Sequence, residues 1–396
     1  MITDFDKVID RRKSSSVKWS SAYNMLSPDE AAARPLPMWV ADMDFRSPPV
    51  VLEALEKAVR DTIFGYRLRS QSYDEAICGW QKRRFGWDVQ PEWLVQTPGV
   101  VTALNMLIQT FTNEGDDILV QPPVYGHFFS TVRENGRQIT EAPLTENDAS
   151  YSFDPDVFEA VITPATKIFI LCNPHNPTGN VWSENDLRLM GDICLKHNIL
   201  VISDEIHQDL ILNGGVKHIP FASLGEEFAQ NSIICTAPSK TFNMAGMHCS
   251  NLFIANKSKR ELFKRTLERT GLNAVNTLGA IACEAAYRGG EDWLEALLTY
   301  IRGNRQHFSS IVQQFFPQLK VFNNDALYMV WMDCRGLNLT VEELEKFFLT
   351  KARVWFDRGP KFGEKGHGFM RVNLGCPRAT VDEALARMKQ ALLNKV

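Results

Sequence analysis

Short apolar runs alternate with amphipathic stretches through most of the chain. Five runs rich in isoleucine, leucine and valine predict β-strands at residues 118–120, 167–171, 199–202, 233–236 and 251–255. Helices are predicted from Ser47 to Val59, with the serine as N-cap and a proline in the first turn, and over 100–111. Strands that alternate with helices form mainly parallel sheets covered on both faces, so the pattern predicts an α/β fold.

The pattern changes beyond about residue 290. A long charged helix with one apolar face is predicted over 293–316, followed by strands at 320–322, 328–332 and 369–373 and a last helix over 381–393. This order is typical of an α+β unit, and 396 residues exceed the usual size of a single core. We therefore predict a large α/β domain over 46–290 and a smaller α+β domain built from 1–45 and 291–396.

Composition narrows the class of protein. The formal net charge of −4 is too small to indicate nucleic acid as a partner. No apolar run approaches the roughly 18 residues that span a bilayer, and the amino terminus lacks a signal-peptide core, so no membrane partner is expected. Eight scattered cysteines, several inside apolar runs, indicate buried thiols in a reducing cytoplasm. The absence of CxxC or paired histidine motifs predicts no metal site.

Lys240 stands beside a hydroxyl residue, Ser239, in residues 236–246 (TAPSKTFNMAG), directly after an apolar run. Such an amine can form a Schiff base with an aldehyde cofactor, while the hydroxyl helps to hold the cofactor's phosphate. Most lysines are solvated surface charges, so this motif alone indicates little. Two other apolar runs also end in polar residues, at 173–179 (NPHNPTG) and 203–207 (SDEIH). Ligands of open α/β sheets bind at that edge, so the three segments together predict one cofactor site.

These three motifs together carry a family resemblance. From about residue 39 to 378 the chain resembles fold-type-I pyridoxal-5'-phosphate (PLP) enzymes of the class I/II aminotransferase superfamily. Within that superfamily it is similar to the MalY/PatB group of cystathionine or cysteine-S-conjugate β-lyases. The resemblance implies PLP as cofactor and a mostly parallel seven-stranded sheet flanked by helices. Tyr66 resembles a tyrosine that reaches the phosphate from the partner subunit, which implies a homodimer with active sites at the interface.

Three residues are predicted to be catalytic. The resemblance implies that Lys240 carries the cofactor and then removes the substrate's α-proton as a general base. Asp204 is expected to keep the pyridine nitrogen protonated, so that the ring accepts electrons. Tyr125 follows a predicted strand and is expected to stack on the pyridine ring. Taken without the neighbouring motifs, Asp204 also fits a turn at a strand end, and Tyr125 fits a half-buried aromatic residue.

Two polar residues are expected to contact the cofactor's phenolic oxygen. Asn176 is expected to donate its amide to this oxygen and to reach the substrate carboxylate, although its prolines and Gly179 also suit a plain turn. His207 stands where many aminotransferases carry a tyrosine that bonds the same oxygen, and a histidine there matches the lyase group. A purely structural role for His207 remains the alternative.

The phosphate is expected at the start of a helix, on Gly99, Val100 and Val101. Free N–H groups and the helix dipole make such a start an anion site, although a Pro-Gly pair before a helix is common. Ser239 is expected to add its hydroxyl. His248 departs from the wider superfamily, where an arginine often binds phosphate at that place, and a neutral imidazole supplies less charge.

Arg371 is the candidate for the substrate α-carboxylate. A planar guanidinium binds a carboxylate through two parallel hydrogen bonds, and the apolar neighbours of Arg371 on a predicted strand favour a partly buried position. Residues 39–45 (WVADMDF) resemble the segment that closes over the substrate, and Ala41 is expected to line the side-chain pocket. Asp42 and Asp44 are interpreted as caps of local turns.

The resemblance implies a carbon–sulfur β-lyase. It would cleave cystathionine or related cysteine S-conjugates by α,β-elimination to pyruvate, ammonia and a thiol. Transamination shares every step up to removal of the α-proton, and no spacing in the chain separates the two reactions. An amino-acid aminotransferase is therefore the first alternative. The second is a lyase with an additional regulatory contact to another protein, for which the sequence locates no surface.

Overall fold

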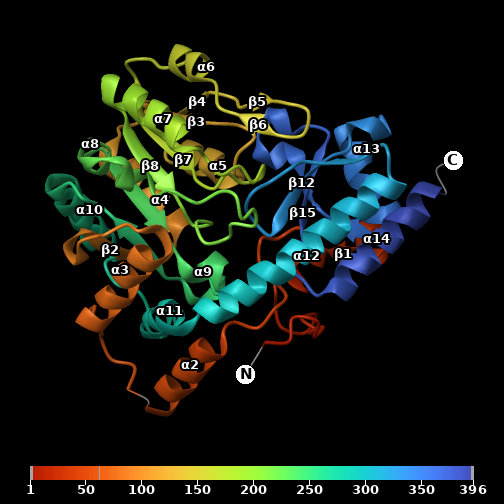
Figure 1. Cartoon of the computed structure of the whole chain (residues 1–396), viewed down its shortest axis with the longest axis horizontal. Helices are drawn as coiled ribbons and strands as arrows, with labels where there is room; N and C mark the ends of the chain where they lie inside the picture. Colours follow the sequence, from red (N-terminus) through yellow and green to blue (C-terminus); the bar gives the residue numbers. More distant parts are fainter. Residues whose placement is uncertain (1–2, 62, 394–396) are drawn as a thin grey trace.

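The computed structural model describes residues 3–61 and 63–393, and its centre is a seven-stranded sheet (Figure 1). The strand order is β2-β10-β9-β8-β7-β3-β4. The bounds are β2 (Leu94–Thr97), β3 (Asp117–Val120), β4 (Gln138–Glu141), β7 (Thr166–Cys172), β8 (Leu200–Asp204), β9 (Ser232–Thr236) and β10 (Ser250–Phe253). β10 runs antiparallel to both of its neighbours, and the other adjacent pairs are parallel. The predicted, mostly parallel sheet is confirmed.

The central strands are buried on both faces because alternate side chains enter two different cores. In β7, Ile168 and Ile170 pack with residues of α4, α5 and α10, whereas Phe169 and Leu171 pack with residues of α3, α7 and α11. The helices around the sheet are α2 (Pro49–Asp61), α3 (Gln71–Phe85), α4 (Val100–Phe111), α5 (Gly126–Glu134), α7 (Glu184–Lys196), α10 (Lys257–Thr270) and α11 (Thr277–Gly289). Burial on both faces requires nearly continuous apolar runs, and these runs made the strands predictable.

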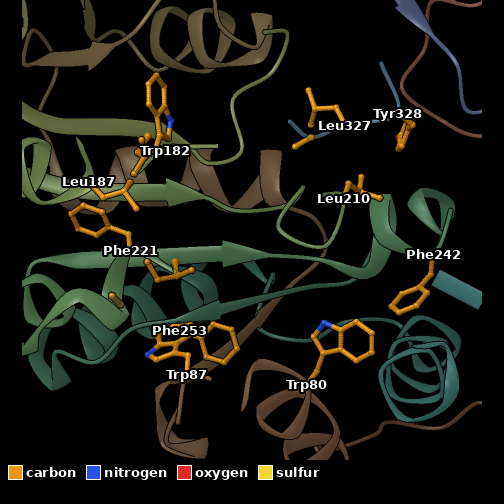
Figure 2. Close-up of a cluster of buried hydrophobic side chains, with 14 of the residues drawn as sticks. Trp80, Trp87, Trp182, Leu187, Leu210, Phe221, Phe242, Phe253, Leu327 and Tyr328 are labelled. Atoms are coloured by element: carbon orange, nitrogen blue, oxygen red, sulfur yellow. The ribbon is translucent and has the colours of Figure 1, made fainter. Parts of the chain in front are cut away.

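The larger core extends from the sheet to the C-terminal part of the chain. Figure 2 shows its side chains, among them Trp80 of α3 and Phe242, whose ring centroids lie 5.5 Å apart. Leu327 and Tyr328 belong to the same core. Phe242 follows Lys240 by two residues, so its burial fixes the backbone of the turn that carries the lysine.

The C-terminal part contains a second, antiparallel sheet in the order β11-β12-β15-β14. Its strands are β11 (Lys320–Val321), β12 (Met329–Asp333), β14 (Asp357–Arg358) and β15 (Phe369–Asn373), and β1 (Leu36–Pro37) pairs in parallel with β13 (Val354–Trp355). Residues from 36–38 and 308–391 form a core of their own beneath this sheet. The predicted α+β pattern of this region is confirmed.

The long helix α12 (Glu291–Phe315) connects the two cores (Figure 1). Leu294 and Leu298 belong to the larger core, whereas Phe308 and Val312 belong to the core of the second sheet. The predicted long helix with an apolar face is confirmed. The division into 46–290 and 1–45 with 291–396 stays a prediction, because the larger core draws residues from both parts.

The other regular elements are mostly short. They are α1 (Pro28–Ala32), α6 (Pro155–Ala160), α8 (Glu226–Gln230), α9 (Pro238–Thr241), α13 (Val341–Lys346), the longer α14 (Arg378–Leu393), and the antiparallel pair β5 (Thr145–Glu146) and β6 (Tyr151–Ser152). All eight cysteines are free thiols, and all except Cys78 are buried, as their apolar surroundings indicated. Within the described ranges, none of the helices combines the length and apolar character needed to cross a bilayer.

Ser47 is not the N-cap of α2, so that prediction is wrong. The helix begins at Pro49, and the carbonyl of Pro48 accepts hydrogen bonds from the N–H groups of Val51 and Leu52. The Ser47 hydroxyl donates instead to the carbonyl of Asn243 at 3.1 Å. A contact with a residue far away in the sequence therefore replaces the local cap.

Candidate active site

A cavity of ≈ 260 Å³ lies beyond the carboxyl ends of β7, β8 and β9, where sheets of this type bind ligands. The structure brings most of the predicted site residues to its wall: Ala41, Gly99, Val100, Val101, Tyr125, Asn176, Asp204, His207, Ser239, Lys240 and His248. A second cavity of ≈ 380 Å³ adjoins it and contains Arg371. Ala41, Tyr125 and Lys240 line both cavities, so the lysine stands at the junction between them.

Lys240 lies in α9, a short helix that directly follows β9 and has Pro238 in its first turn. Its Nζ donates to the carbonyl oxygen of Ala41 at 2.7 Å. Burial, and then the charge of Arg371, lowers the pKa of Lys240 from 10.5 to about 8. A larger fraction of this amine is therefore neutral near physiological pH than of an ordinary lysine, and the neutral amine is the form that acts as a nucleophile or base.

Asp204 ends β8 and is buried at the base of the cavity. Its Oδ1 accepts a hydrogen bond from the backbone N–H of Ile206 at 3.2 Å. Burial raises the pKa of Asp204 from 3.8 to about 7, against the lowering effect of that backbone hydrogen bond. A carboxyl group in this environment gains from a cationic ligand group beside it, because such a partner compensates for the lost hydration.

One end of the cavity is formed by the start of α4. Gly99 precedes the helix with a φ of 138°, a conformation that favours glycine, and its N–H donates to the Ser250 hydroxyl at 3.2 Å. The N–H groups of Val100 and Val101 lie in the first turn, where no helical acceptor exists. Ser239 and the exposed His248 line the same cavity. These donors and the helix dipole suit an anionic group.

Three further predicted residues surround the cavity. Burial raises the pKa of the Tyr125 hydroxyl, so this group stays protonated. His207 is buried, its Nδ1 has no hydrogen-bond partner within the described part of the chain, and burial lowers its pKa well below the ordinary value. A neutral imidazole with a free ring nitrogen can bond to a ligand. Asn176 joins the two cavities, because its Oδ1 accepts from Arg371 Nη1 at 3.1 Å.

Arg371 on β15 is buried, as its apolar neighbours predicted, and it is held by several groups. Nη2 donates to Asp357 Oδ2 at 2.8 Å and to the carbonyl of Trp39 at 3.0 Å. Its Nε is buried and has no partner among the described residues. Asp357 also pairs with Lys361 Nζ at 2.7 Å. An arginine fixed in this way, with its Nε–H still unused, is suited to bind a carboxylate.

Residues 39–44, here called the strap, cross between the two cavities. Three of its carbonyl groups accept hydrogen bonds from side chains. Two of these donors are on β15: Arg371 bonds the carbonyl of Trp39, and Asn373 Nδ2 bonds that of Asp42 at 2.7 Å. The third is Asn243, just after α9, whose Nδ2 bonds the carbonyl of Met43 at 2.9 Å. The carbonyl of Ala41 accepts from Lys240 and also from the Tyr328 hydroxyl at 2.8 Å. The strap therefore orients Lys240 directly.

The acidic residues of the strap do more than cap turns. Asp44 is buried and accepts hydrogen bonds of 2.7 Å from Lys18 Nζ, Trp19 Nε1 and Arg11 Nη1. Asp42 Oδ2 accepts from Arg11 Nη2 at 2.8 Å. The prediction that the two aspartates cap local turns is therefore wrong. Their carboxylates bind side chains of the amino-terminal segment and hold that segment against the strap.

Two residues depart from the predicted picture. Tyr66 lines neither cavity of this chain; it is fully exposed beside a separate surface groove.

Asp357, the carboxylate partner of Arg371, was not predicted from the sequence. It lies in the two-residue strand β14, and no motif or periodicity marks it, so its role becomes visible only when β14 pairs with β15.

The raised pKa of Asp204 leads to a prediction for the protein without cofactor. A buried carboxyl group whose pKa is about 7 binds more protons in the folded than in the unfolded state between about pH 4 and 7. Its contribution to stability is therefore present at low pH and is lost as the pH rises through 7. The free energy of unfolding of Asp204→Asn minus that of the wild type should increase by roughly 2–3 kcal/mol from pH 5 to pH 8.

Denaturant unfolding of both proteins at the two pH values measures this difference. Asp192→Asn, at an exposed position of α7, is the matched control and should show no such change. A difference for Asp204→Asn that is the same at pH 5 and pH 8 would show that Asp204 titrates like an ordinary carboxyl group.

Comparison with known proteins gives the family. The family model for aminotransferase class I and II matches residues 38–388. The chain is 45% identical over 390 residues to cystathionine beta-lyase PatB of Bacillus subtilis, which covers 98% of this chain and 100% of PatB. Cystalysin from Treponema denticola, solved with a PLP cofactor, matches the structure with a TM-score of 0.95 at 36% identity, over 100% of both chains. A PLP-bound C-S lyase from Staphylococcus hominis matches with a TM-score of 0.90 at 31% identity, over 99% of both chains.

These similarities extend over nearly the whole chain, and they agree with the sheet order and with the position of the cavity at the ends of β7, β8 and β9. The PLP fold-type-I architecture expected from the sequence is confirmed by the solved relatives. The chain belongs to the class I and II aminotransferase family.

Proposed function

We propose that this chain is a PLP-dependent carbon–sulfur β-lyase that cleaves cystathionine or related cysteine S-conjugates to pyruvate, ammonia and a thiol. The main observation is the position of Lys240, which lines both the cavity of Asp204 and the cavity of Arg371. An amine at this junction can contact a cofactor in the first cavity and a substrate in the second. The 45% identity to cystathionine beta-lyase PatB supports the lyase rather than the aminotransferase.

The residues of the first cavity fit PLP. Buried Asp204 forms no ion pair among the described residues, and a protonated pyridine nitrogen would supply one; the amides of Val100 and Val101 suit the phosphate. The unpartnered Nδ1 of His207 and the side chain of Asn176 are available to the phenolic oxygen. When bound, PLP supplies an aldehyde that condenses with amines and a ring that withdraws electrons from the substrate's α-carbon.

The chain's own residues then position the substrate and move its protons. Arg371 binds the α-carboxylate through its guanidinium, which fixes the α-carbon near Lys240. Lys240, whose lowered pKa leaves a larger fraction of the amine neutral than in an ordinary lysine, takes the proton from the α-carbon. Cleavage of the bond between the β-carbon and sulfur releases the thiolate into the second cavity.

We also propose a homodimer in which Tyr66 contacts the phosphate of the PLP bound by the partner subunit. Exposed apolar residues lie near Tyr66 in the sequence, since Ile63 and Leu68 are 91% and 90% exposed. Apolar surface of this kind is typical of an interface between proteins. The predicted cytoplasmic setting and the division into a large and a small domain also remain proposals.

Pyruvate release tests the reaction type. The purified protein with PLP should release pyruvate from cystathionine in the absence of any keto acid, and lactate dehydrogenase coupled to NADH oxidation measures this rate. An absolute requirement for an added keto acid would mean that the protein is an aminotransferase instead.

A further inference from the structure

Asp209 is a buried carboxylate to which the reaction described above gives no role. It follows β8 shortly after Asp204, is 2% exposed and lines neither cavity. Its Oδ2 accepts a hydrogen bond from the Thr241 hydroxyl at 2.8 Å, and its Oδ1 accepts one from Trp80 Nε1 at 3.0 Å. Arg84 Nε lies 3.9 Å from Oδ1 and balances part of the charge. Both oxygens are occupied by groups of the protein, so Asp209 connects parts of the chain and binds no ligand.

The two hydrogen-bond donors act on the residues that directly follow Lys240. Thr241 is the next residue of α9 and is fully buried. Trp80 of α3 packs against the residue after it, Phe242, with the ring centroids 5.5 Å apart (Figure 2). The contacts of Asp209 therefore reach the backbone on the carboxyl side of Lys240 in two ways, directly through the threonine and indirectly through the tryptophan.

The turn that contains Asp209 also forms one wall of the cofactor cavity. Asp204, at the end of β8, and His207 line this cavity, and Lys240 lines it from α9. The hydrogen bond between Asp209 and Thr241 thus connects the two elements by their side chains, outside the cavity itself. Because this bond is buried, its loss leaves an acceptor without a donor, and the arrangement that makes the bond is favoured over others.

We propose that Asp209 is a positioning residue for Lys240: through Thr241 it fixes the lysine relative to Asp204 and His207. PLP is a rigid ring that contacts all three of these residues, and bonds form fast only when the reacting atoms are held close together. The inference rests on Lys240 as the residue that binds PLP, which is part of the proposed function. It does not depend on whether the reaction is elimination or transamination.

Removal of the Thr241 hydroxyl tests the proposal. Thr241→Val keeps the shape of the side chain but leaves Asp209 Oδ2 without its donor. When PLP is added to the PLP-free protein, the lysine amine and the aldehyde join as a C=N bond with loss of water, and the absorbance of lysine-bound PLP reports the rate. This rate constant should fall by about five- to thirtyfold in Thr241→Val. The value of kcat should fall by a similar factor, whereas KM should change by less than about twofold.

Two further variants separate positioning from stability. Thr241→Ser restores the hydroxyl, so the rate of PLP attachment should return to within about threefold of the wild type. Thr112→Val is the matched control, because Thr112 is also buried and its hydroxyl donates to the Ile108 carbonyl at 2.6 Å, at the carboxyl end of α4. Its free energy of unfolding should fall, while PLP attaches at the wild-type rate.

A double variant shows whether the two side chains act together. Asp209→Ala should slow PLP attachment at least as much as Thr241→Val, and the combination should be no slower than Asp209→Ala alone. Denaturant unfolding confirms that each variant is folded.

The outcomes separate this inference from the proposed function. A wild-type rate in folded Thr241→Val, or equal losses in Thr241→Val and Thr112→Val, would overturn the positioning role. Failure of the lyase function looks different: PLP would attach to the wild type at its normal rate, and no pyruvate would appear without a keto acid.

Discussion

Replacement of Lys240 by alanine is expected to abolish pyruvate release, with a fall in kcat of at least about 10²–10⁴-fold, the usual contribution of a positioned acid or base. The reason is its position: Lys240 is the lysine that lines both the cofactor and the substrate cavity, and burial lowers its pKa to about 8. Among the described residues, Lys240 supplies the amine that lines the cofactor cavity, and no second lysine is there to replace it. The coupled lactate dehydrogenase assay measures the loss, and the absorbance spectrum should lose the band of lysine-bound PLP.

Lys259→Ala provides the matched control. Lys259 lies on α10, and its Nζ donates to the Gln230 carbonyl at 3.0 Å, away from both cavities. This variant should keep the activity and colour of the wild type. Substantial pyruvate release by a correctly folded Lys240→Ala protein would mean that another group removes the α-proton.

Loss of the guanidinium at position 371 should produce the second large effect. Arg371→Ala is expected to lower kcat/KM by about 30-fold to a few thousand-fold, the equivalent of roughly 2–5 kcal/mol for one partner of a buried charge pair. The variant removes the proposed carboxylate site and leaves Asp357 paired with Lys361 alone. Steady-state kinetics should show the loss mainly as a higher KM, while the amount of bound PLP stays close to that of the wild type.

Two variants check whether the effect belongs to Arg371. Arg371→Lys keeps the charge but cannot bond Asn176, Trp39 and Asp357 together, so its activity should be intermediate. Arg378→Ala removes an arginine that bonds Asn304 at 2.8 Å and lines neither cavity, so KM should change little. A near-normal KM in Arg371→Ala would reject the assigned role.

The parts of the fold that sequence predicts best are those that are buried on both sides. β7, β8 and β9 are continuous apolar runs, and each is followed by polar residues at the edge of the sheet where the cavity forms. The two edge strands lack this signal, since β4 (QITE) is exposed at both ends and β2 (LVQT) begins with only two apolar residues. Both were therefore missed as individual strands.

Long-range side-chain contacts were the other limit of prediction. The hydroxyl of Ser47 bonds to Asn243 and not to its own helix, and Asp357 reaches Arg371 only because β14 pairs with β15. Neither contact has a local spacing that could reveal it. The strap shows the same limit, since Asp42 and Asp44 accept hydrogen bonds from Arg11 and Lys18, some 24 to 33 residues earlier in the chain.

Chemical labelling of the cofactor-binding residue tests the central claim most directly. The purified protein with bound PLP is treated with sodium borohydride, digested and mapped by mass spectrometry. A pyridoxyl-phosphate group attached to the peptide that contains Lys240, and to that lysine within it, is the predicted result. Attachment to a different lysine, or a protein that takes up no PLP at all, would contradict the account.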